Sequence, residues 1–308
     1  MQAIREALAR LSSSYIAVGF AFAVGSAALF AIRPIFVKLA YAEGVEPVTL
    51  IGLRMLFSAP IYAVLLWLFI RRGRNKVPIT LPLVAQISGI GLFGYFLASF
   101  FDLIGLQYVS AQLGRMILYT YPTFVVILSA LFMGQAITLR TAAALLVTYI
   151  GISVIFGHDL SEFGPEVSVG ALWIIASGLS FSVYLILSKS LITKVGSQVF
   201  TCIALISASF GIFTYWAITS PAIDMALAVN NTALLIILII AIFCTVIPTF
   251  FTTAAVERIG AGRTGIVAMI GPAFTSVFAV LILQEAFTVY HLLGIVITVI
   301  GVSLLPRN

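Results

Sequence analysis

Apolar residues along this chain fall into ten long runs separated by short polar stretches. Each run is close to the roughly 20 residues that an α-helix needs to cross about 30 Å of hydrocarbon. The alternating ten-residue segments typical of membrane barrels do not occur. The sequence therefore predicts an all-α, polytopic membrane protein with ten transmembrane helices. The predicted spans are 16–40, 48–70, 81–103, 111–133, 138–156, 167–187, 198–218, 232–255, 263–283 and 286–305.

The second half of the chain repeats the pattern of the first half at a separation of about 150 residues. Each unit holds five predicted helices, and an odd number of crossings makes the second copy enter the membrane from the opposite side. Two inverted five-helix repeats are typical of secondary transporters, with a substrate site near the midplane between them. A duplicated scaffold without transport is the alternative. The matched pairs include Pro122 with Pro272, Phe124 with Phe274, Thr148 with Thr298, Gly151 with Gly301 and, at a separation of 151, Gly19 with Gly170 and Lys38 with Lys189.

The repeat also sets the expected domain boundaries. We expect the first repeat over residues 1–156 and the second over residues 157–308. Residues 1–15 place three apolar side chains on one face, which favours a short interfacial helix before the first span; a frayed terminus is the alternative. One chain that carries both repeats makes a monomer sufficient.

Basic residues gather on one side of the predicted helices. With the N-terminus in the cytoplasm, twelve of the sixteen Lys and Arg residues fall on the inner side, as the positive-inside rule requires. We therefore expect both termini inside. Only 8% of the residues are charged and 62% are hydrophobic, and anionic membrane lipid, not nucleic acid, accounts for the net charge of +6. The twelve are Arg5, Arg10, Arg71, Arg72, Arg74, Lys76, Arg140, Lys189, Lys194, Arg258, Arg263 and Arg307.

Two stretches carry a family resemblance: LIGLQYVSAQLGRMILYTYPTFVVILSALFMGQAIT at 103–138 and AAVERIGAGRTGIVAMIGPAFTSVFAVLILQEAFT at 254–288. Both resemble the ten-helix EamA-type exporters of the drug/metabolite transporter superfamily, in which a small-residue stretch precedes a helix with a central proline. The first is most similar to bacterial aromatic amino-acid exporters of the YddG type. The resemblance implies export of metabolites from the cytoplasm across a bacterial inner membrane, without a cofactor. One departure is Gln135, where the family usually has Glu and the second copy keeps Glu285.

Polar side chains recur at helical spacing in equivalent helices of the two halves. Polar groups inside a bilayer usually face the protein interior or a water-filled cavity, so these faces predict a substrate pathway of mixed polar and aromatic character. Hydrogen bonds from Ser and Thr to their own helix are the alternative. The residues are Ser26, Phe30 and Arg33 with Ser177, Phe181 and Tyr184, and Tyr95, Ser99 and Asp102 with Thr245, Thr249 and Thr252.

Three arginines lie at comparable depth towards the predicted outer surface. These are Arg33, Arg54 and Arg115; Asp102 lies a little farther out, and Tyr119 follows one turn after Arg115. Guanidinium groups bind a carboxylate bidentately, and an acidic or aromatic side chain receives an ammonium group. We therefore expect an outward vestibule that binds an amino acid or a related metabolite. A purely structural ion pair and arginines that reach the headgroups are the alternatives.

Two prolines interrupt the matched stretches. Pro122 is expected near the middle of the fourth helix and Pro272 in the inner half to middle of the ninth. Proline removes a backbone hydrogen bond and permits a kink. We expect both prolines to act as hinges during alternating access, and static kinks required for packing are the alternative.

Several other classes of function are disfavoured. An HExxH helix and a nucleophile–base pair are missing, and His158 and His291 are expected in different extracytoplasmic regions. We therefore predict no catalytic residues, no metal site and no enzymatic activity, with a membrane-embedded enzyme as a remote alternative. Cys202 and Cys244 are expected to be small core residues. The sequence leaves open proton antiport or facilitated exchange, and export or facilitated passage of another small metabolite or drug.

Overall fold

The computed structural model describes residues 2–74, 76–134, 136–218 and 229–304. Over these residues the chain forms helices and turns and contains no strand, so the all-α prediction is confirmed. Nine described helical spans are long and apolar enough to cross a membrane, and Val289–Ser303 is a tenth, shorter apolar helix. The nine spans are Tyr15–Ala42, Pro47–Arg71, Leu81–Gly105, Ala111–Met133, Leu139–Phe163, Glu166–Val195, Ser197–Trp216, Asn231–Gly260 and Arg263–Leu283.

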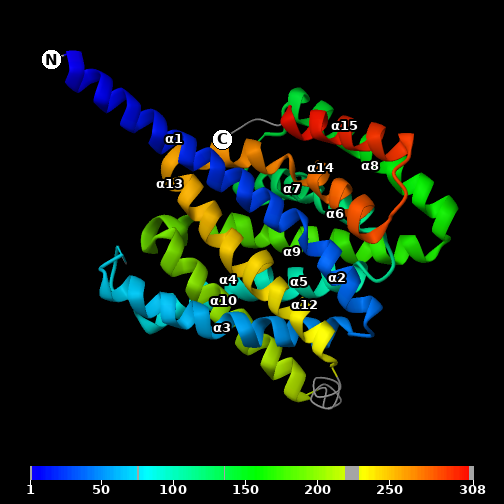
Figure 1. Cartoon of the computed structure of the whole chain (residues 1–308), viewed down its shortest axis with the longest axis horizontal. Coiled ribbons are helices and arrows are strands. Elements are labelled where there is room, and N and C mark those ends of the chain that lie inside the picture. Colours follow the sequence, from blue (N-terminus) through cyan, green and yellow to red (C-terminus); the bar gives the residue numbers. More distant parts are fainter. Residues whose placement is uncertain (1, 75, 135, 219–228, 305–308) are drawn as a thin grey trace.

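Several spans consist of more than one helical segment (Figure 1). Helices dominate because every backbone polar group in hydrocarbon has to be satisfied within its own segment. The segments are α1 (Gln2–Ala31), α2 (Arg33–Ala42), α3 (Pro47–Arg71), α4 (Leu81–Gly91), the π-helical turn η1 (Leu92–Leu97), α5 (Ala98–Gly105), α6 (Ala111–Leu118), α7 (Tyr121–Met133), α8 (Leu139–Phe163), α9 (Glu166–Val195), α10 (Ser197–Ile218), α12 (Asn231–Ala241), η2 (Ile242–Val246), α13 (Ile247–Ala268), α14 (Gly271–Phe278), η3 (Ala279–Leu283) and α15 (Val289–Ser303).

Helix α1 differs from the expectation for the N-terminus. It runs from Gln2 to Ala31 without interruption, so residues 2–15 continue the first span and do not form a separate interfacial helix. Figure 1 shows this end of α1 extending away from the other helices. The physical reason is that no glycine or proline lies between residues 2 and 15 to end the helix.

Prolines mark the breaks within three spans. Pro34, Pro122 and Pro272 each lie in the first turn of a new segment, in α2, α7 and α14. A proline fits there because its fixed φ suits a helix start and its missing N–H would have no partner at that position. We had expected Pro122 and Pro272 to kink continuous helices; instead, each begins a new half-helix. The break before Arg33 was not predicted.

Irregular backbone recurs along the chain at the spacing of the sequence repeat. The π-helical turns η1 at 92–97 and η2 at 242–246 lie 150 residues apart. Left-handed residues end α7 at Gly134 (φ 65°) and η3 at Gln284 (φ 56°), again 150 residues apart. The chain thus repeats its departures from α-helix as well as its apolar runs.

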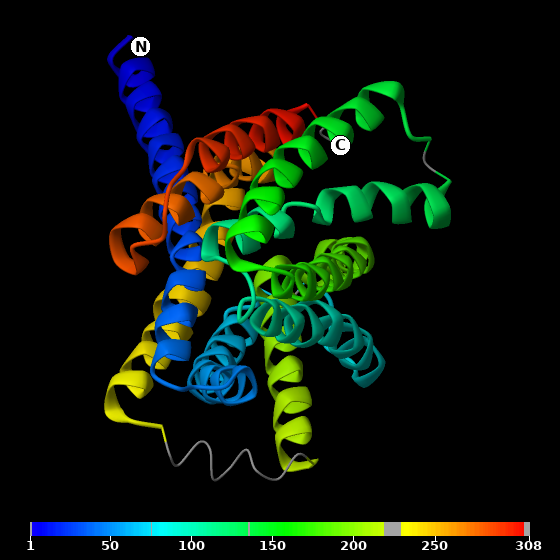
Figure 2. The same ribbon diagram turned by 90° about the vertical axis from the view of Figure 1, so that its right-hand side faces the viewer.

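Helices that precede the Gly164–Pro165 turn pack mainly on helices that follow it. The principal neighbours are α1 with α13, α3 with α10, α5 with α9, and α8 with α15, and Figure 2 shows α8 and α15 side by side. Two hydrogen bonds match across these contacts: Ser26 donates to the Pro248 carbonyl at 3.0 Å, and Ser177 donates to the Ala98 carbonyl at 2.7 Å. Large apolar side chains such as Phe132 and Leu131 cover the outside, 80% and 73% exposed, as a lipid-facing surface requires.

Small residues allow α8 and α15 to approach closely. An added Cβ at Gly151 would lie 2.7 Å from the Gly294 carbonyl oxygen and 2.6 Å from the Thr298 amide nitrogen. Thr298 donates from Oγ1 to the Thr148 carbonyl oxygen at 3.5 Å. Membrane helices associate through such small-residue contacts, because lipid supplies no hydrophobic force between them.

We expect Gly151→Ala to destabilise the protein by about 1–3 kcal/mol, since its methyl group meets backbone that has to move. Gly157→Ala is the matched control, because an added Cβ at Gly157 on the same helix has nothing within 4 Å. The control should be neutral or stabilising, by up to about 1 kcal/mol, because alanine favours a helix more than glycine does. Denaturation in mixed micelles measures both, and equal stability of the two variants would contradict the close crossing.

Candidate functional site

An ion pair joins two of the predicted site residues. Arg33, the first residue of α2, donates from Nη2 to Asp102 Oδ2 on α5 at 3.0 Å, and the two side chains are 20% and 12% exposed. With Arg115 and four further residues they line a pocket of about 10 Å³, room for about one water molecule. The four further residues are Pro34, Leu106, Gly114 and Leu118.

Arg54 on α3 is enclosed and does not reach an outward vestibule, which corrects the expected position. It is 2% exposed, and its Nε atom has no hydrogen-bond partner within the described part of the chain. The guanidinium interacts electrostatically with Arg33, Asp102 and Tyr41. A buried charge is costly unless it is paired and hydrogen-bonded, so Arg54 is an energetically expensive residue beside the ion pair.

Arg115 and Tyr119 lie at the break between α13 and α14. Tyr119 donates from its hydroxyl to the Ala268 carbonyl at 2.7 Å, and the Arg115 guanidinium lies 6.0 Å from the Tyr119 ring centroid. Both side chains approach Gly271 closely, since an added Cβ would lie 3.0 Å from the Tyr119 hydroxyl and 3.4 Å from Arg115 Nη2. The sequence analysis identified Arg115 and Tyr119 as candidate site residues, but it did not show that they lie against the break between α13 and α14.

Positive charge exceeds negative charge around this pocket. Arg33, Arg54 and Arg115 contribute three guanidinium groups and Asp102 one carboxylate, which leaves a local charge of +2. The Nε atoms of all three arginines are buried without a hydrogen-bond partner in the described residues. Buried polar groups are normally satisfied, so the pocket offers unused donors to a negatively charged group.

Three of the predicted aromatic residues, Tyr95, Phe181 and Tyr184, form a separate cluster that Tyr121 joins. Tyr95 and Tyr184 share a hydrogen bond between their hydroxyls at 3.0 Å, and Phe181 stacks on Tyr184 with ring centroids 5.6 Å apart. Tyr121 meets Phe181 edge-on at 5.5 Å. None of these four rings lines the pocket around Arg33. Tyr62, which sequence reasoning missed, is a buried residue of α3 whose hydroxyl donates to the Thr245 carbonyl at 3.3 Å.

The predicted serine and threonine residues behave differently from one another. Thr245 donates to the Ile240 carbonyl at 2.9 Å within its own span, and Thr249 donates to the Thr245 carbonyl at 2.6 Å. The alternative of hydrogen bonds to their own helix therefore holds for these two threonines. Ser99 is half-buried on α5.

Glu285 holds the start of α6. Its Oε1 accepts from the Ala111 amide at 2.8 Å, and its Oε2 accepts from Gln112 Nε2 at 3.3 Å. A carboxylate stabilises a helix N-terminus by satisfying free N–H groups and by favourable interaction with the helix dipole. Glu285 therefore fixes the segment that carries Arg115, and its counterpart Gln135 lies outside the described residues.

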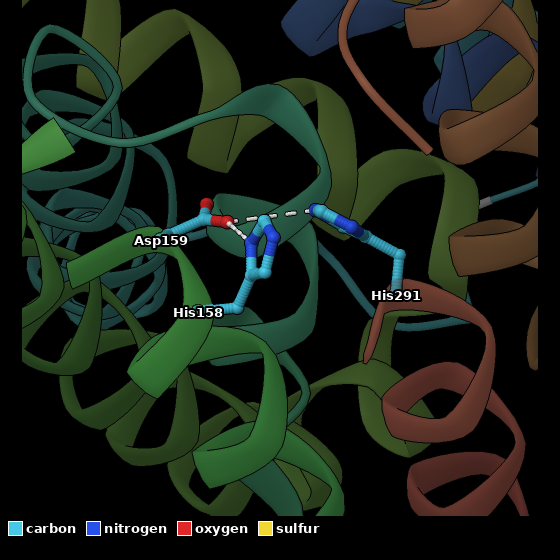
Figure 3. A group of neighbouring side chains, drawn as sticks. All are labelled: His158, Asp159 and His291. Carbon is cyan, nitrogen blue, oxygen red and sulfur yellow. Dashed lines mark hydrogen bonds and ion pairs between the residues drawn. The ribbon is translucent and has the colours of Figure 1, made fainter. Parts of the chain in front are cut away.

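Two histidines that we expected in different regions lie together (Figure 3). The centroids of their rings are 5.1 Å apart. Both rings approach Asp159 Oδ1, His158 through Nδ1 at 3.3 Å and His291 through Nε2 at 3.5 Å. The expectation was wrong because α8 extends to Phe163 and packs beside the start of α15. No sequence motif links residues so far apart in the chain.

Comparison with known proteins supports a transport function. The chain is 27% identical over 283 residues to the uncharacterized transporter YcbK of Bacillus subtilis, covering 90% of this chain and 89% of that protein. An uncharacterized transporter of Vibrio cholerae is 27% identical over 274 residues, covering 88% and 85%, respectively. One of Archaeoglobus fulgidus is 24% identical over 271 residues, covering 88% and 91%.

A solved crystal structure shares the fold with a TM-score of 0.62 at 16% identity, and the match covers 94% of this chain and 95% of that one. Residues 17–157 and 168–306 each match the description of the EamA-like transporter family. The two matches leave only short stretches of the chain unmatched. The chain therefore belongs to the EamA-like transporter family and is a multi-pass membrane transporter.

Proposed function

We propose that this transporter exports small carboxylate-bearing metabolites, foremost amino acids with hydrophobic or aromatic side chains, across the bacterial inner membrane. The observation that carries the proposal is the pocket lined by Arg33, Arg115 and Asp102, with the buried Arg54 guanidinium close to the same ion pair. The Nε atoms of these three arginines have no hydrogen-bond partner among the described residues. Guanidinium groups recognise carboxylates through charge-assisted, bidentate hydrogen bonds. Asp102 receives the ammonium group of the same substrate.

The aromatic cluster suits an apolar substrate side chain. Tyr95, Phe181 and Tyr184 lie on η1 and α9, and the hydroxyls of the two tyrosines share a hydrogen bond. Aromatic rings offer both an apolar face and a cation-binding face. A substrate that spans the two groups of residues would satisfy a carboxylate at one end and bury a side chain at the other.

The two halves act as inverted repeats, residues 1–156 and 157–308, in a monomer with both termini in the cytoplasm. Two observations support this arrangement: the irregular turns recur at a separation of 150 residues, and Ser26 and Ser177 donate to carbonyls that are themselves 150 residues apart. Exposed Arg71, at the end of α3, and Arg72 and Arg74, which follow it, lie on the side assigned to the cytoplasm.

Transport proceeds by alternating access, with Pro122 and Pro272 at the hinges. The pocket of about 10 Å³ is too small for an amino acid, so a substrate requires the helices to separate. Broken helices near a substrate site are typical of secondary transporters. The breaks before α2, α7 and α14 place flexible points beside Arg33, Tyr119 and Gly271, respectively.

Counterflow in proteoliposomes tests the proposal. Vesicles loaded with one unlabelled amino acid should accumulate the same labelled compound, and a panel of amino acids identifies the substrate. Arg33→Ala and Tyr119→Phe should each weaken substrate affinity, by about 10-fold or more where a charge-assisted hydrogen bond is lost. Exchange of no amino acid, or unchanged affinity in both variants, would sink the amino-acid proposal.

The charge of +2 favours a second candidate, an organic anion that lacks an amine. Such a substrate needs the arginines and makes no use of Asp102 as an acceptor. Including mono- and dicarboxylates in the same panel separates the candidates. Exchange of the carboxylates and not of the amino acids would select the second.

A further inference from the structure

Three potential metal ligands converge where α8 ends and α15 begins. The donor atoms are His158 Nδ1, Asp159 Oδ1 and His291 Nε2, and all of them lie within 4.8 Å of one another. Figure 3 shows both imidazole rings directed towards the same side of the Asp159 carboxylate. Two imidazoles and one carboxylate are a common ligand set for zinc and for neighbouring transition metals.

The two distances to Asp159 Oδ1 are long for charge-assisted hydrogen bonds and leave room for a shared ion. Asp159 Oδ1 lies 3.3 Å from His158 Nδ1 and 3.5 Å from His291 Nε2. Charge-assisted N–H···O hydrogen bonds are typically about 2.7–2.9 Å long. Ligand bonds of about 2.0–2.1 Å at tetrahedral angles place neighbouring donor atoms about 3.3–3.4 Å apart. The two separations from Asp159 Oδ1 are therefore close to the edges of such a tetrahedron, and the two histidine nitrogens lie within 4.8 Å of each other.

Outer contacts orient the three ligand residues. His291 Nδ1 lies 2.9 Å from Thr288 Oγ1 and 3.3 Å from the Thr288 amide nitrogen. Ion binding at Nε2 requires the ring proton on Nδ1, where the Thr288 hydroxyl oxygen can accept it. Ser110 donates from its hydroxyl to the second carboxylate oxygen, Asp159 Oδ2, at 2.7 Å. Metal-binding histidines and carboxylates are usually oriented by such outer contacts. The cluster therefore has both the ligands and their supports.

Burial and charge also fit a divalent cation. Asp159 is fully buried, the His291 side chain is 4% exposed, and the His158 side chain, at 16%, leaves a route for entry. Lys38 interacts electrostatically with both Asp159 and Glu285. With both histidines neutral, the carboxylates of Asp159 and Glu285 and the ammonium group of Lys38 sum to a local charge of −1. This charge attracts a cation.

We propose that His158, Asp159 and His291 bind a divalent transition-metal ion of the zinc class that joins α8 to α15. Three protein ligands leave the fourth position for a water molecule. Ser110 begins α6 and contacts Asp159, so the ion also fixes the start of the segment that carries Arg115. The proposal concerns ion binding and is independent of which substrate is transported.

A cobalt titration of the full-length protein tests the site. The protein is purified in detergent without a polyhistidine tag, Co²⁺ is added, and the visible absorption of four- or five-coordinate cobalt is followed. The chain has only two histidines, so an imidazole-dependent band is assigned to this cluster. We expect one Co²⁺ per chain, displacement by Zn²⁺, and a melting temperature that rises with Zn²⁺.

Variants locate the ion. His158→Ala and His291→Ala should each weaken binding by at least about 100-fold, and Ser110→Ala by about 10-fold through loss of an outer contact. Glu162→Gln, an exposed acid one turn from His158, should bind as wild type. His291 also takes part in the cap of α15. If His291→Ala does not fold for that reason, the Co²⁺ affinity of His158→Ala decides the test. A wild type without saturable Co²⁺ binding, or binding that survives both histidine substitutions, would overturn the proposal.

Discussion

Arg54→Met is expected to abolish most substrate exchange while the protein becomes more stable. The side chain is 2% exposed, and its Nε has no partner among the described residues. Replacing buried charged groups by apolar side chains of similar volume is often stabilising, by about 1–4 kcal/mol. Transport should fall about 10- to 100-fold, because a charge-assisted contact to the substrate carboxylate is lost. A fall in transport together with a rise in stability would distinguish a role of Arg54 in substrate binding from a role in packing.

The control for this variant is Arg71→Met on the same helix. Arg71 is exposed in the last turn of α3 and lies over the Trp67 ring at 4.1 Å, so its removal should change stability by about 0.5 kcal/mol or less. Exchange rates and denaturation in mixed micelles are measured for both. If Arg54→Met lowers stability and leaves exchange unchanged, Arg54 serves packing and has no part in substrate binding.

Asp102→Asn is expected to be far more damaging than Arg33→Met, although the two substitutions break the same ion pair. Removal of the carboxylate leaves the three guanidinium groups without a counter-charge, a local charge of +3. Removal of Arg33 leaves Asp102 with Arg54 and Arg115 and a charge of +1. Loss of one partner of a buried pair costs about 3–5 kcal/mol; with partial exposure we expect about 2–4 kcal/mol for Asp102→Asn and under about 1 kcal/mol for Arg33→Met.

A double-mutant cycle checks the reason for this asymmetry. Adding Arg54→Met to Asp102→Asn should restore much of the lost stability, because one of the repelling charges is removed. Adding Arg71→Met should restore none. Equal stability of Asp102→Asn and Arg33→Met would mean that Arg54 and Arg115 do not interact with Asp102. The proposed grouping of the three arginines with Asp102 would then be incorrect.

The sequence predicted the helices well because a membrane span leaves a long apolar run. The ten runs correspond to the nine spans and the shorter helix Val289–Ser303. An arginine partner for Asp102 could be expected in advance because charged groups inside a bilayer need partners, and the structure shows that it is Arg33. Periodicity also found Tyr95 and Tyr184, which the structure places in contact.

Other features depend on which helices pack side by side, and periodicity does not specify that. The cluster of His158, Asp159 and His291 forms only because α8 lies against α15. The separation of the aromatic cluster from the arginine pocket likewise follows from helix positions. The break before Arg33 did have a local signal, Pro34. It was overlooked because Pro34 lies within a continuous apolar run.

The packing of early helices on late ones has a consequence for biosynthesis. Because α1 lies on α13, α3 on α10 and α8 on α15, the first five spans leave the ribosome before their neighbours exist. Grooves such as the one at Gly151 must then face lipid until α15 is inserted. Assembly is therefore completed only after translation has reached the last helix, and the nascent half-chain is the stage at which membrane chaperones and quality-control proteases have most access to it.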